Sequence, residues 1–595
     1  MEKSKITKSL AVFASVLLII IIGVASFAYF GTFNVNLNNN VAVNINSSSP
    51  GDATFTSNAT QLNLQVPAAN MSYTVANNTV AAKEDTAFLD VTLTGSENLL
   101  TTCTYDIVYE YDAGSNVYGQ GTTNKTSGAT KEITIEVNGM NGNNHFATET
   151  NFDHANIQSY YDSTNKYYKL VEGATIKSLG STQSVRWKIT GRYYNLDVSQ
   201  AQLGGKNFTG KIYAISKGCS SEDGTTVKKG YETILANNGG VASMTTLTST
   251  DFATVTTASD KGMYKAQDDL GTSYYFRGAV DNNWVKYGKY TKDTYITADS
   301  NNNTSLVDSC DGIAKCYKIA SKGDDMYWRI IRVNGDNSIR MIYTGTSAPD
   351  SNTKVVMTES TNNSGYIRAT SAGKSKFNQH YNSAEYVGYM FTVGEQHGTS
   401  KSSDIKTYLD NWYANYTNLN STGTKITDQI YCNDRTASTS DAAYSTTNYT
   451  TLTNWASTGT AYYYGTYGRI VKGNNPMLTC AVDSDRFTVN KINSKGNSAL
   501  TYPIGLITID EVEMAGNNWS ESNTSYYLRT GAYYWAGSPI VFDDGTFAGE
   551  FSVLKDGNLY SAYVFDSAGV RGVVSLSSDA KLLGSGTYDD VYVVS

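Results

Sequence analysis

The chain has 595 residues and a formal net charge of −8 at pH 7, with 40% hydrophobic and only 17% charged residues. This length predicts two to four domains. The acidic balance, with no Lys/Arg cluster beyond the N-terminus, argues against nucleic acid as a partner. Tyrosine occurs 46 times and proline 6 times, and with abundant Thr, Val, Asn and Gly this composition indicates a β-rich protein with many turns.

The N-terminus has the pattern of a membrane anchor. Three lysines precede an uncharged apolar run over residues 10–30, and the next basic residue is Lys83. About 21 helical residues at roughly 1.5 Å each cross the hydrocarbon core of a bilayer. Because basic residues flank the cytoplasmic side, we predict a cytoplasmic tail (1–8), a transmembrane signal anchor (9–33) and an extracellular remainder.

A cleaved signal peptide is the alternative to an anchor, and small residues at Val24-Ala25-Ser26 could support cleavage. The apolar run is longer than the usual signal core of about 7–15 residues, and aromatic residues follow it as an interfacial belt would. These features favour the anchor, and therefore a single-pass cell-membrane protein.

Residues 34–245 predict a β-sandwich, because apolar and polar residues alternate in several short runs. The clearest runs are residues 88–95, 103–111, 131–139, 185–196 and 209–216. Residues 246–270 are rich in Thr and Ser and weakly patterned, which is typical of a linker.

Residues 271–595 predict an α+β domain. Residues 326–345 alternate around an Asn-Gly-Asp turn as a hairpin does. Residues 402–416 carry one apolar stripe at helical spacing, with Ser402 or Ser403 as the N-cap. Thr508 and Glu511 form a capping box for a second helix that Gly516 would end.

Six cysteines in an exported chain favour disulfide bonds over a metal site, and no C-x-x-C occurs. We expect pairing between neighbours within each domain: Cys103–Cys219, Cys310–Cys316 and Cys432–Cys480. The alternative is that these cysteines are unpaired and buried.

The last 320 or so residues resemble a family of anchored surface proteins of Gram-positive gut bacteria, which are mostly uncharacterised. The strings that carry the resemblance are YYFRGAVDNNWVKYG (274–288), YWRIIRVNGDNSIRMIY (327–343), YCNDR (431–435), YPIGLITIDEVEMAG (502–516), YYWAGSP (533–539) and GVRGVVSL (569–576). The final part also resembles the C-type-lectin-like fold of the formylglycine-generating enzymes. The resemblance implies a multidomain, β-rich protein whose C-terminal domain is lectin-like.

The functional residues of those two folds are missing from this chain. No Glu-Pro-Asn, Gln-Pro-Asp or Trp-Asn-Asp calcium motif occurs, and no cysteine follows Cys480. Neither calcium-dependent sugar binding of the lectin type nor formylglycine-generating activity therefore carries over, and a shared scaffold does not fix function.

Two groups of residues remain as candidate sites. Exposed aromatic side chains can stack on sugars or peptides, and the candidates are Arg529, Tyr533, Tyr534 and Trp535; strand packing is the competing explanation. Asp483 and Asp485 are the best candidates for a calcium site, because Cys480 would fix their loop. Other paired acids, such as Asp268-Asp269, are interpreted as solvated turn carboxylates.

We therefore expect a non-enzymatic, membrane-anchored surface protein that binds an external glycan or protein ligand, without a cofactor unless calcium is bound. A self-associating structural component of the envelope is the alternative. An exported glycan-acting enzyme is less favoured, because the sequence offers no convergent set of catalytic residues.

Overall fold

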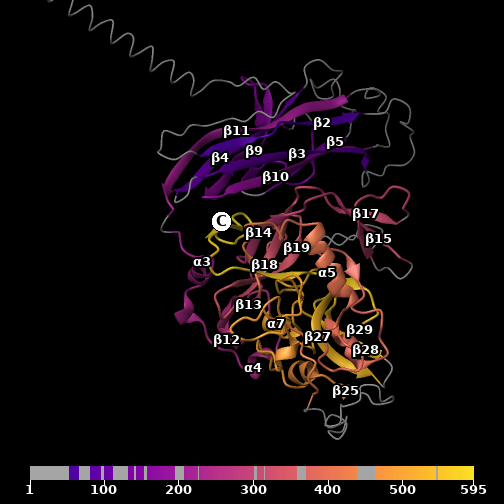
Figure 1. Cartoon of the computed structure of the whole chain (residues 1–595). Helices are drawn as coiled ribbons and strands as arrows, with labels where there is room; N and C mark the ends of the chain where they lie inside the picture. The colour runs from indigo at the N-terminus through magenta and orange to yellow at the C-terminus, as the bar shows by residue number, and fades with distance from the viewer. Residues whose placement is uncertain are drawn as a thin grey trace, which may run out of the picture.

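A computed structural model describes residues 53–65, 81–95, 99–111, 132–139, 142–152, 157–194, 207–224, 227–299, 304–313, 315–357, 370–438, 462–543 and 547–595. The predicted cytoplasmic tail and membrane anchor lie outside these residues. No helix of the described part is long and apolar enough to span a membrane. The described part is β-rich, with its strands in several separate sheets (Figure 1).

The N-terminal unit is a pair of antiparallel sheets packed face to face. One sheet runs in the order β1 (Thr54–Ser57), β3 (Ala81–Thr94), β10 (Thr182–Tyr194), β5 (Ile133–Asn138) and β7 (Thr150–Asn151). The other runs in the order β2 (Thr60–Gln65), β11 (Asn207–Asp223), β4 (Leu99–Tyr111), β9 (Tyr167–Leu179) and β6 (Asn143–Asn144), with η2 (Gln158–Tyr160) leading into β8 (Tyr161–Asp162) on β9. We call this unit the sandwich.

Alternating side chains of the two sheets fill the core of the sandwich, as the period-two pattern predicts. Leu89 and Val91 of β3 are fully buried and face Tyr105 and Ile107 of β4 within one hydrophobic cluster. At its centre the Nε1–H of Trp187 donates a hydrogen bond to the Tyr105 hydroxyl, 3.0 Å away. The indole is therefore buried without an unsatisfied donor.

The second unit, from residue 230 to the end of the chain, is built on one large mixed sheet. Its order is β23 (Ile426–Thr427), β31 (Val573–Leu576), β19 (Ile339–Gly345), β18 (Asp325–Val333), β14 (Trp284–Lys289), β33 (Tyr592–Val594) and β32 (Leu582–Leu583), and the hairpin of β12 (Lys261–Asp268) and β13 (Gly271–Gly278) joins it at β18. A second sheet orders β20 (Lys374–Ser375), β30 (Ala568–Gly569), β27 (Tyr534–Asp543), β28 (Phe547–Val553) and β29 (Leu559–Tyr563), with β25 (Tyr462–Tyr463) on β27.

Smaller elements complete the second unit. Three small sheets are β16 (Thr304–Val307) with β15 (Thr294–Ala298) and β17 (Cys316–Ala320), β21 (Met390–Phe391) with β22 (Lys401–Ser402), and β24 (Tyr431–Cys432) with β26 (Arg486–Phe487). The helices are α3 (Gly230–Asn237), η4 (Val241–Ser243), α4 (Ser249–Phe252), η5 (Ala384–Val387), α5 (Asp404–Asn415), α6 (Gly465–Tyr467), η7 (Gly468–Lys472), η8 (Asp483–Asp485) and α7 (Ile509–Met514).

Local sequence signals place several of these elements correctly. The predicted hairpin is present as β18 and β19, and α5 begins after Ser403, whose hydroxyl accepts a hydrogen bond from the Lys406 amide. The predicted capping box of Thr508 and Glu511 starts α7. Residues 246–270, the expected linker, contain α4 and β12, and β12 pairs with β13 along its whole length.

Three disulfide bonds pair all six cysteines as the sequence predicts. Cys103 of β4 and Cys219 of β11 lie directly opposite each other in the sandwich. Cys310–Cys316 closes a short loop before β17, and Cys432–Cys480 ties β24 to the loop before η8.

The end of the chain contacts the sandwich. The Gln183 side chain of β10 donates a hydrogen bond to the Val594 carbonyl (3.0 Å), and the Ser595 hydroxyl donates one to the Leu179 carbonyl (2.5 Å). Nearby, the buried Lys286 ammonium of β14 donates to the Ser184 carbonyl, 3.1 Å away. The edge of the sandwich thus rests on β14 and β33 of the second unit (Figure 1).

Candidate functional site

A cavity opens in the second unit where the β12–β13 turn, β18, β19 and α7 meet. Its enclosed part measures about 30 Å³, room for about two ordered waters, and the space between its walls, mouth included, is about 510 Å³. Leu270, Met477 and Leu478 contribute apolar surface. Eight charged side chains also line the cavity: Asp268, Asp269, Arg332, Arg340, Asp434, Arg469, Asp510 and Glu511.

Arg332 of β18 lies at the centre of the first group of charges. Its Nη1 is 2.7 Å from Asp268 Oδ2, and its Nε is 2.9 Å from Glu511 Oε1. Arg340 of β19 shares the same carboxylate, with Nε 2.6 Å from Glu511 Oε1. Burial raises the pKa of a carboxyl group, but Arg340 and Arg332 outweigh burial and hold the pKa of Glu511 below its usual value. Two guanidinium groups and two carboxylates thus meet in this part of the wall.

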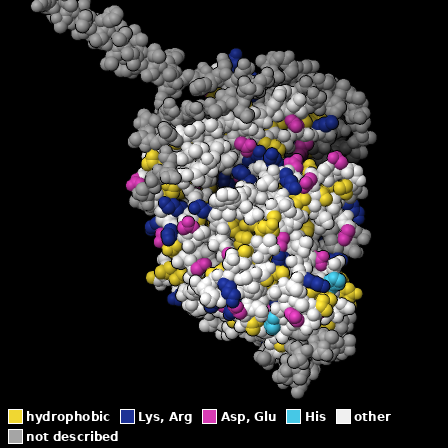
Figure 2. All heavy atoms as spheres, viewed as in Figure 1, with side chains coloured by type: hydrophobic (Ala, Val, Ile, Leu, Met, Phe, Trp, Pro, Cys, Tyr) yellow, Lys and Arg dark blue, Asp and Glu magenta, His cyan; other side chains and the backbone are white. Residues whose placement is uncertain are grey.

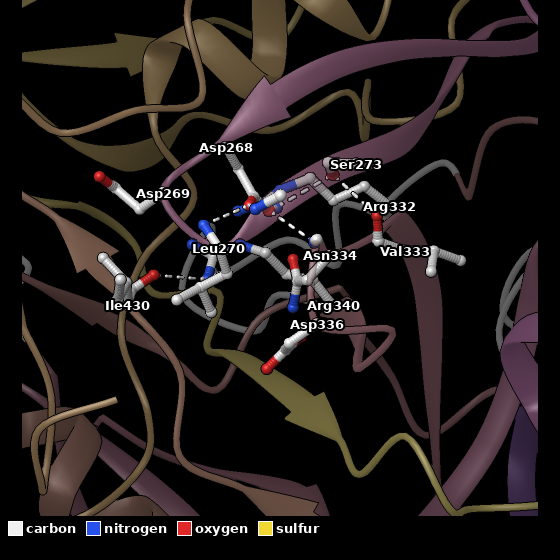
Figure 3. Close-up of polar contacts among 12 residues, drawn as sticks. Asp268, Asp269, Leu270, Ser273, Arg332, Val333, Asn334, Asp336, Arg340 and Ile430 are labelled. Atoms are coloured by element: carbon white, nitrogen blue, oxygen red, sulfur yellow. Dashed lines mark hydrogen bonds and ion pairs between the residues drawn. The ribbon is translucent and has the colours of Figure 1, made fainter. Parts of the chain in front are cut away.

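The turn between β12 and β13 presents Asp268 to Arg332. Asp268 Oδ1 accepts hydrogen bonds from the amides of Leu270 (2.8 Å) and Gly271 (3.0 Å), and Oδ2 accepts one from the Gly335 amide (2.8 Å). An Asp that binds the backbone two residues ahead is a common turn device. In Figure 3, Asp268 points toward the Arg332 guanidinium, whereas Asp269 points away from it.

Helix α7 presents two acids to different arginines. Glu511 faces Arg332 and Arg340, while its neighbour Asp510 binds Arg469, with Nε 3.0 Å from Asp510 Oδ1. The Arg469 Nη1 also lies 2.7 Å from Asp434 Oδ2. Two carboxylates thus share one guanidinium, which leaves one surplus negative charge in this part of the wall.

Asp269 forms a third group with the opposite imbalance. Its Oδ1 lies 3.0 Å from Arg486 Nη2 and 3.8 Å from Lys495 Nζ. Neither of these bases lines the cavity. Arg486 also pairs with Asp483 (Nη1 to Oδ1, 3.3 Å), and Lys491 lies 4.0 Å from Asp483. Three cations thus face two carboxylates, which leaves one surplus positive charge behind this part of the wall.

One polar group of the cavity is without a partner. The Arg332 side chain is only 8% exposed, and its Nε and Nη1 bind Glu511, Asp268 and Ser273. No hydrogen bond within the described residues involves its Nη2. This nitrogen is not among the fully buried unpaired atoms of the described part, so water or a ligand can accept a hydrogen bond from it.

A neutral acid lies beside the charged wall. Glu513 of α7 is fully buried, and neither of its carboxyl oxygens has a hydrogen-bond partner within the described residues. Burial, with a smaller contribution from Asp510, raises the pKa of Glu513 to about 9. The Glu513 carboxyl therefore keeps its proton at neutral pH and adds no charge to the network.

The aromatic candidates from the sequence belong mainly to the core. Tyr534 and Trp535 are buried, and their polar atoms donate hydrogen bonds to the carbonyls of Leu528 and Ser375. Tyr533 is partly buried, with its ring 6.4 Å from that of Trp535. Arg529 is partly exposed and donates a hydrogen bond to the Lys555 carbonyl. The four side chains do not form one exposed surface.

The two calcium candidates are bound to cations. Asp485 is fully buried, with its Oδ1 2.6 Å from Arg435 Nη2 and its Oδ2 3.0 Å from His397 Nδ1. Asp483 is exposed and lies 3.3 Å from Arg486 Nη1. In the part of the chain that is described, no group of three or more His, Cys, Asp or Glu side chains could hold a metal ion.

The sequence analysis did not select the cavity residues. The interpretation of Asp268 and Asp269 as solvated turn carboxylates was wrong, because both side chains are about 95% buried in ion pairs. A signal was present: Arg332, Arg340, Asp434, Asp510 and Glu511 all lie inside the strings that carry the family resemblance. A charged residue within an apolar strand-like string is seldom buried unless it is paired.

No protein-family model matches the chain, and neither a curated protein nor a solved structure is similar to it. The role of the cavity therefore has to be inferred from its own chemistry.

Proposed function

We propose that this chain is a membrane-anchored surface protein that binds an external glycan or protein ligand without catalysis, as the anchored surface proteins it resembles would. The proposal places residues 9–33 in the cell membrane and the sandwich and the second unit, as a lectin-like domain, outside the cell. All six cysteines are paired, which fits an oxidising compartment outside the cytoplasm.

The cavity is the observation that carries the binding proposal. Concave sites with a few convergent polar groups and an apolar rim are the usual places for ligands. Here the polar groups are held in place by ion pairs before any ligand arrives, and such preorganisation reduces the entropy lost on binding.

The non-catalytic part of the proposal rests on the state of the reactive groups. Cys432 at the cavity is in a disulfide bond, and the hydroxyls of Thr508 and Ser538 accept hydrogen bonds from the amides of Glu511 and Ile509. Among the described residues, no histidine is bonded to any of these three groups, which supports a binding role rather than covalent catalysis through them.

The test is to apply full-length protein in detergent to an array that carries glycans, mucins and extracellular proteins. The measurement is made with and without a calcium chelator. Met477 at the mouth is 36% exposed, so M477W should block the cavity without unfolding the protein. V393W is the matched control, because Val393 is 58% exposed and does not line the cavity.

Saturable binding that M477W abolishes and V393W leaves intact would support the proposal. Binding that both variants retain would exclude the cavity as the site. Loss of binding in chelator would favour calcium at Asp483 and Asp485. An array without any binding would turn attention to self-association.

An exposed aromatic patch favours self-association as a second candidate function. Tyr381 and Tyr563 are 40% and 37% exposed, and with Phe547 and Phe565 they form a cluster of rings 4.8 to 5.7 Å apart. Hydrophobic side chains reach the surface over the region of β28 and β29 (Figure 2). Contiguous exposed aromatic surface is typical of protein interfaces.

Light scattering over a range of protein concentrations would test this second function. If the aromatic patch joins copies of the chain, the double variant Tyr381→Ser, Tyr563→Ser should remain monomeric at concentrations where the wild type assembles. Tyr560→Ser removes an equally exposed tyrosine outside the patch and should assemble like the wild type. A wild type that stays monomeric throughout would rule out this function.

A further inference from the structure

We propose that the cavity recognises a compact zwitterion, a ligand group with one ammonium and one carboxylate a few ångströms apart, as in an α-amino acid. This inference rests on the proposed function, since it names the chemistry of the group that the cavity would hold. It follows from where the charges of the wall balance and where they do not.

The network as a whole is neutral. Six carboxylates are matched in number by six cations: Asp268, Asp269, Asp434, Asp483, Asp510 and Glu511 against Arg332, Arg340, Arg469, Arg486, Lys491 and Lys495. A ligand with a net charge would have to enter a site that has no counter-charge left for it, and desolvating an uncompensated charge is costly. The ligand is therefore neutral overall.

The balance is not uniform along the wall. Asp434 and Asp510 share Arg469, so this part is negative by one charge. Each outer oxygen, Asp434 Oδ2 and Asp510 Oδ2, accepts a single hydrogen bond within the described residues, from Arg469. A carboxylate oxygen has room for another donor, and an ammonium would supply both that donor and the missing positive charge.

The other imbalance favours an anion. Arg486, Lys491 and Lys495 outnumber Asp269 and Asp483 by one, which leaves a surplus positive charge. The nine-tenths buried Arg332 lines the same cavity with an Nη2 that lacks a partner among the described residues. A ligand carboxylate would accept hydrogen bonds from this group. Charge-assisted bonds of this kind are roughly twice as strong as those between neutral groups.

The size of the cavity limits the ligand to a small group. The enclosed base has about 30 Å³ of free space, enough for the polar atoms of one such group in place of about two waters. The rest of the ligand would lie in the mouth against Leu270, Met477 and Leu478. A neutral sugar could also bind through hydroxyl groups, but it would leave both charge imbalances uncompensated.

Calorimetric titration of full-length protein in detergent would test the proposal with four small probes of different charge. They are alanine (zwitterion), alaninamide (cation), N-acetylalanine (anion) and methyl glucoside (neutral). We expect saturable binding of alanine, with at least tenfold weaker binding of the other three. M477W should abolish alanine binding, and V393W should leave it unchanged.

Asp434→Asn gives a second, independent readout. The variant removes the surplus negative charge while Asn Oδ1 can still accept the bond that the Thr436 amide donates to Asp434 Oδ1. Alanine should then bind at least tenfold more weakly, and N-acetylalanine should bind as well as alanine or better. A structural role of Asp434 alone would weaken all probes equally.

The outcomes distinguish failure of the zwitterion proposal from failure of the proposed function. Methyl glucoside binding that M477W abolishes, without alanine binding, would show that the cavity takes a neutral glycan. Retention of alanine binding by M477W would place the site elsewhere, against both proposals. If no probe binds while the array gives a ligand that M477W blocks, only the zwitterion is excluded.

Discussion

The sandwich and the second unit bury similar aliphatic and aromatic side chains, but they use arginine differently. In the sandwich, Arg186 and Arg192 remain partly exposed and pair with partly exposed carboxylates. In the second unit the fully buried arginines are Arg329, Arg340, Arg435 and Arg571.

Strand length explains the difference. The sandwich has strands of up to 17 residues, so most of its backbone groups bond to each other across the sheets. The second unit has many two-residue strands and long loops, whose carbonyls need other donors. Arg329 donates to the carbonyls of Val280 and Val355, and Arg435 to those of Met390 and Gly398. Buried guanidinium groups thus act as connectors for irregular backbone.

The largest expected effect tests what holds the sandwich together. Cys103 and Cys219 are separated by 116 residues, whereas Cys310 and Cys316 are separated by 6. Loop-closure entropy predicts that removing the first bond (C103A/C219A) lowers the free energy of unfolding by about 4–5 kcal/mol, and removing the second (C310A/C316A) by about 2 kcal/mol. Hydrogen-exchange mass spectrometry in denaturant can follow the two units separately.

Equal losses in the two cysteine variants would contradict this prediction. So would a loss from C103A/C219A that appears only in peptides of the second unit, because this bond lies wholly within the sandwich.

The next effect concerns a connector of the second unit. Arg340→Met removes one of the two arginines that pair with Glu511 and the donors to the carbonyls of Ile430 and Leu506. Breaking a buried ion pair costs about 3–5 kcal/mol. Because Arg332 still pairs with Glu511, we expect the free energy of unfolding of the second unit to fall by about 3 kcal/mol. Combining Arg340→Met with Glu511→Met should recover much of the loss, since both charges are then gone. Failure of the double variant to recover would show that the carbonyl bonds matter more than the ion pair.

This contrast also explains how much of the molecule could be predicted from its sequence. Regular elements follow from local rules, so the hairpin of β18 and β19, the cap of α7 at Thr508 and the start of α5 after Ser403 were predicted correctly. The sandwich strands β3, β4, β5, β10 and β11 were found because period-two alternation marks a half-buried sheet, whereas β9 was not predicted.

The cavity could not be predicted, because its residues come from segments far apart in the chain. Arg332 and Glu511 are separated by 179 residues, and Arg486 and Asp269 by 217. Charges inside apolar strings indicate that a buried partner exists, but no local pattern shows which distant residue that partner is. The same holds for Tyr534 and Trp535, which point to opposite faces of β27 and become core residues because other segments cover both faces there.

A dependence of stability on pH is expected in the second unit, where Glu513 lies. Glu513 has a pKa of about 9 in the folded protein and an ordinary value of about 4.3 when unfolded. The folded state keeps a proton that the unfolded state releases, so this residue makes stability fall as pH rises from about 4.5 to 9, with no further change outside that window. At pH 7 the raised pKa of Glu513 lowers the free energy of unfolding by about 3 kcal/mol relative to its value at acidic pH.

Glu513→Gln should remove that contribution. Measured against the wild type by denaturant unfolding from pH 5 to 9, the variant should gain stability steadily with pH and differ little at pH 5. Burial also raises the pKa of Glu550 well above the usual range. In both the wild type and the variant, Glu550 therefore makes the free energy of unfolding fall as the pH rises. A stability difference that does not change with pH would mean that Glu513 is ionised in the folded state.

The smallest effect is expected in the sandwich. Arg192 of β10 lies 2.8 Å from Glu84 and 2.7 Å from Glu136, but all three side chains contact solvent. Exposed ion pairs contribute about 0–1 kcal/mol, so Arg192→Met should lower the free energy of unfolding of the sandwich by less than about 1 kcal/mol. High salt should weaken even this effect, because it screens surface charges, but should leave the effect of Arg340→Met nearly unchanged. If Arg192→Met proved as harmful as Arg340→Met, arginine would be a connector in both units, and strand length would not be what separates them.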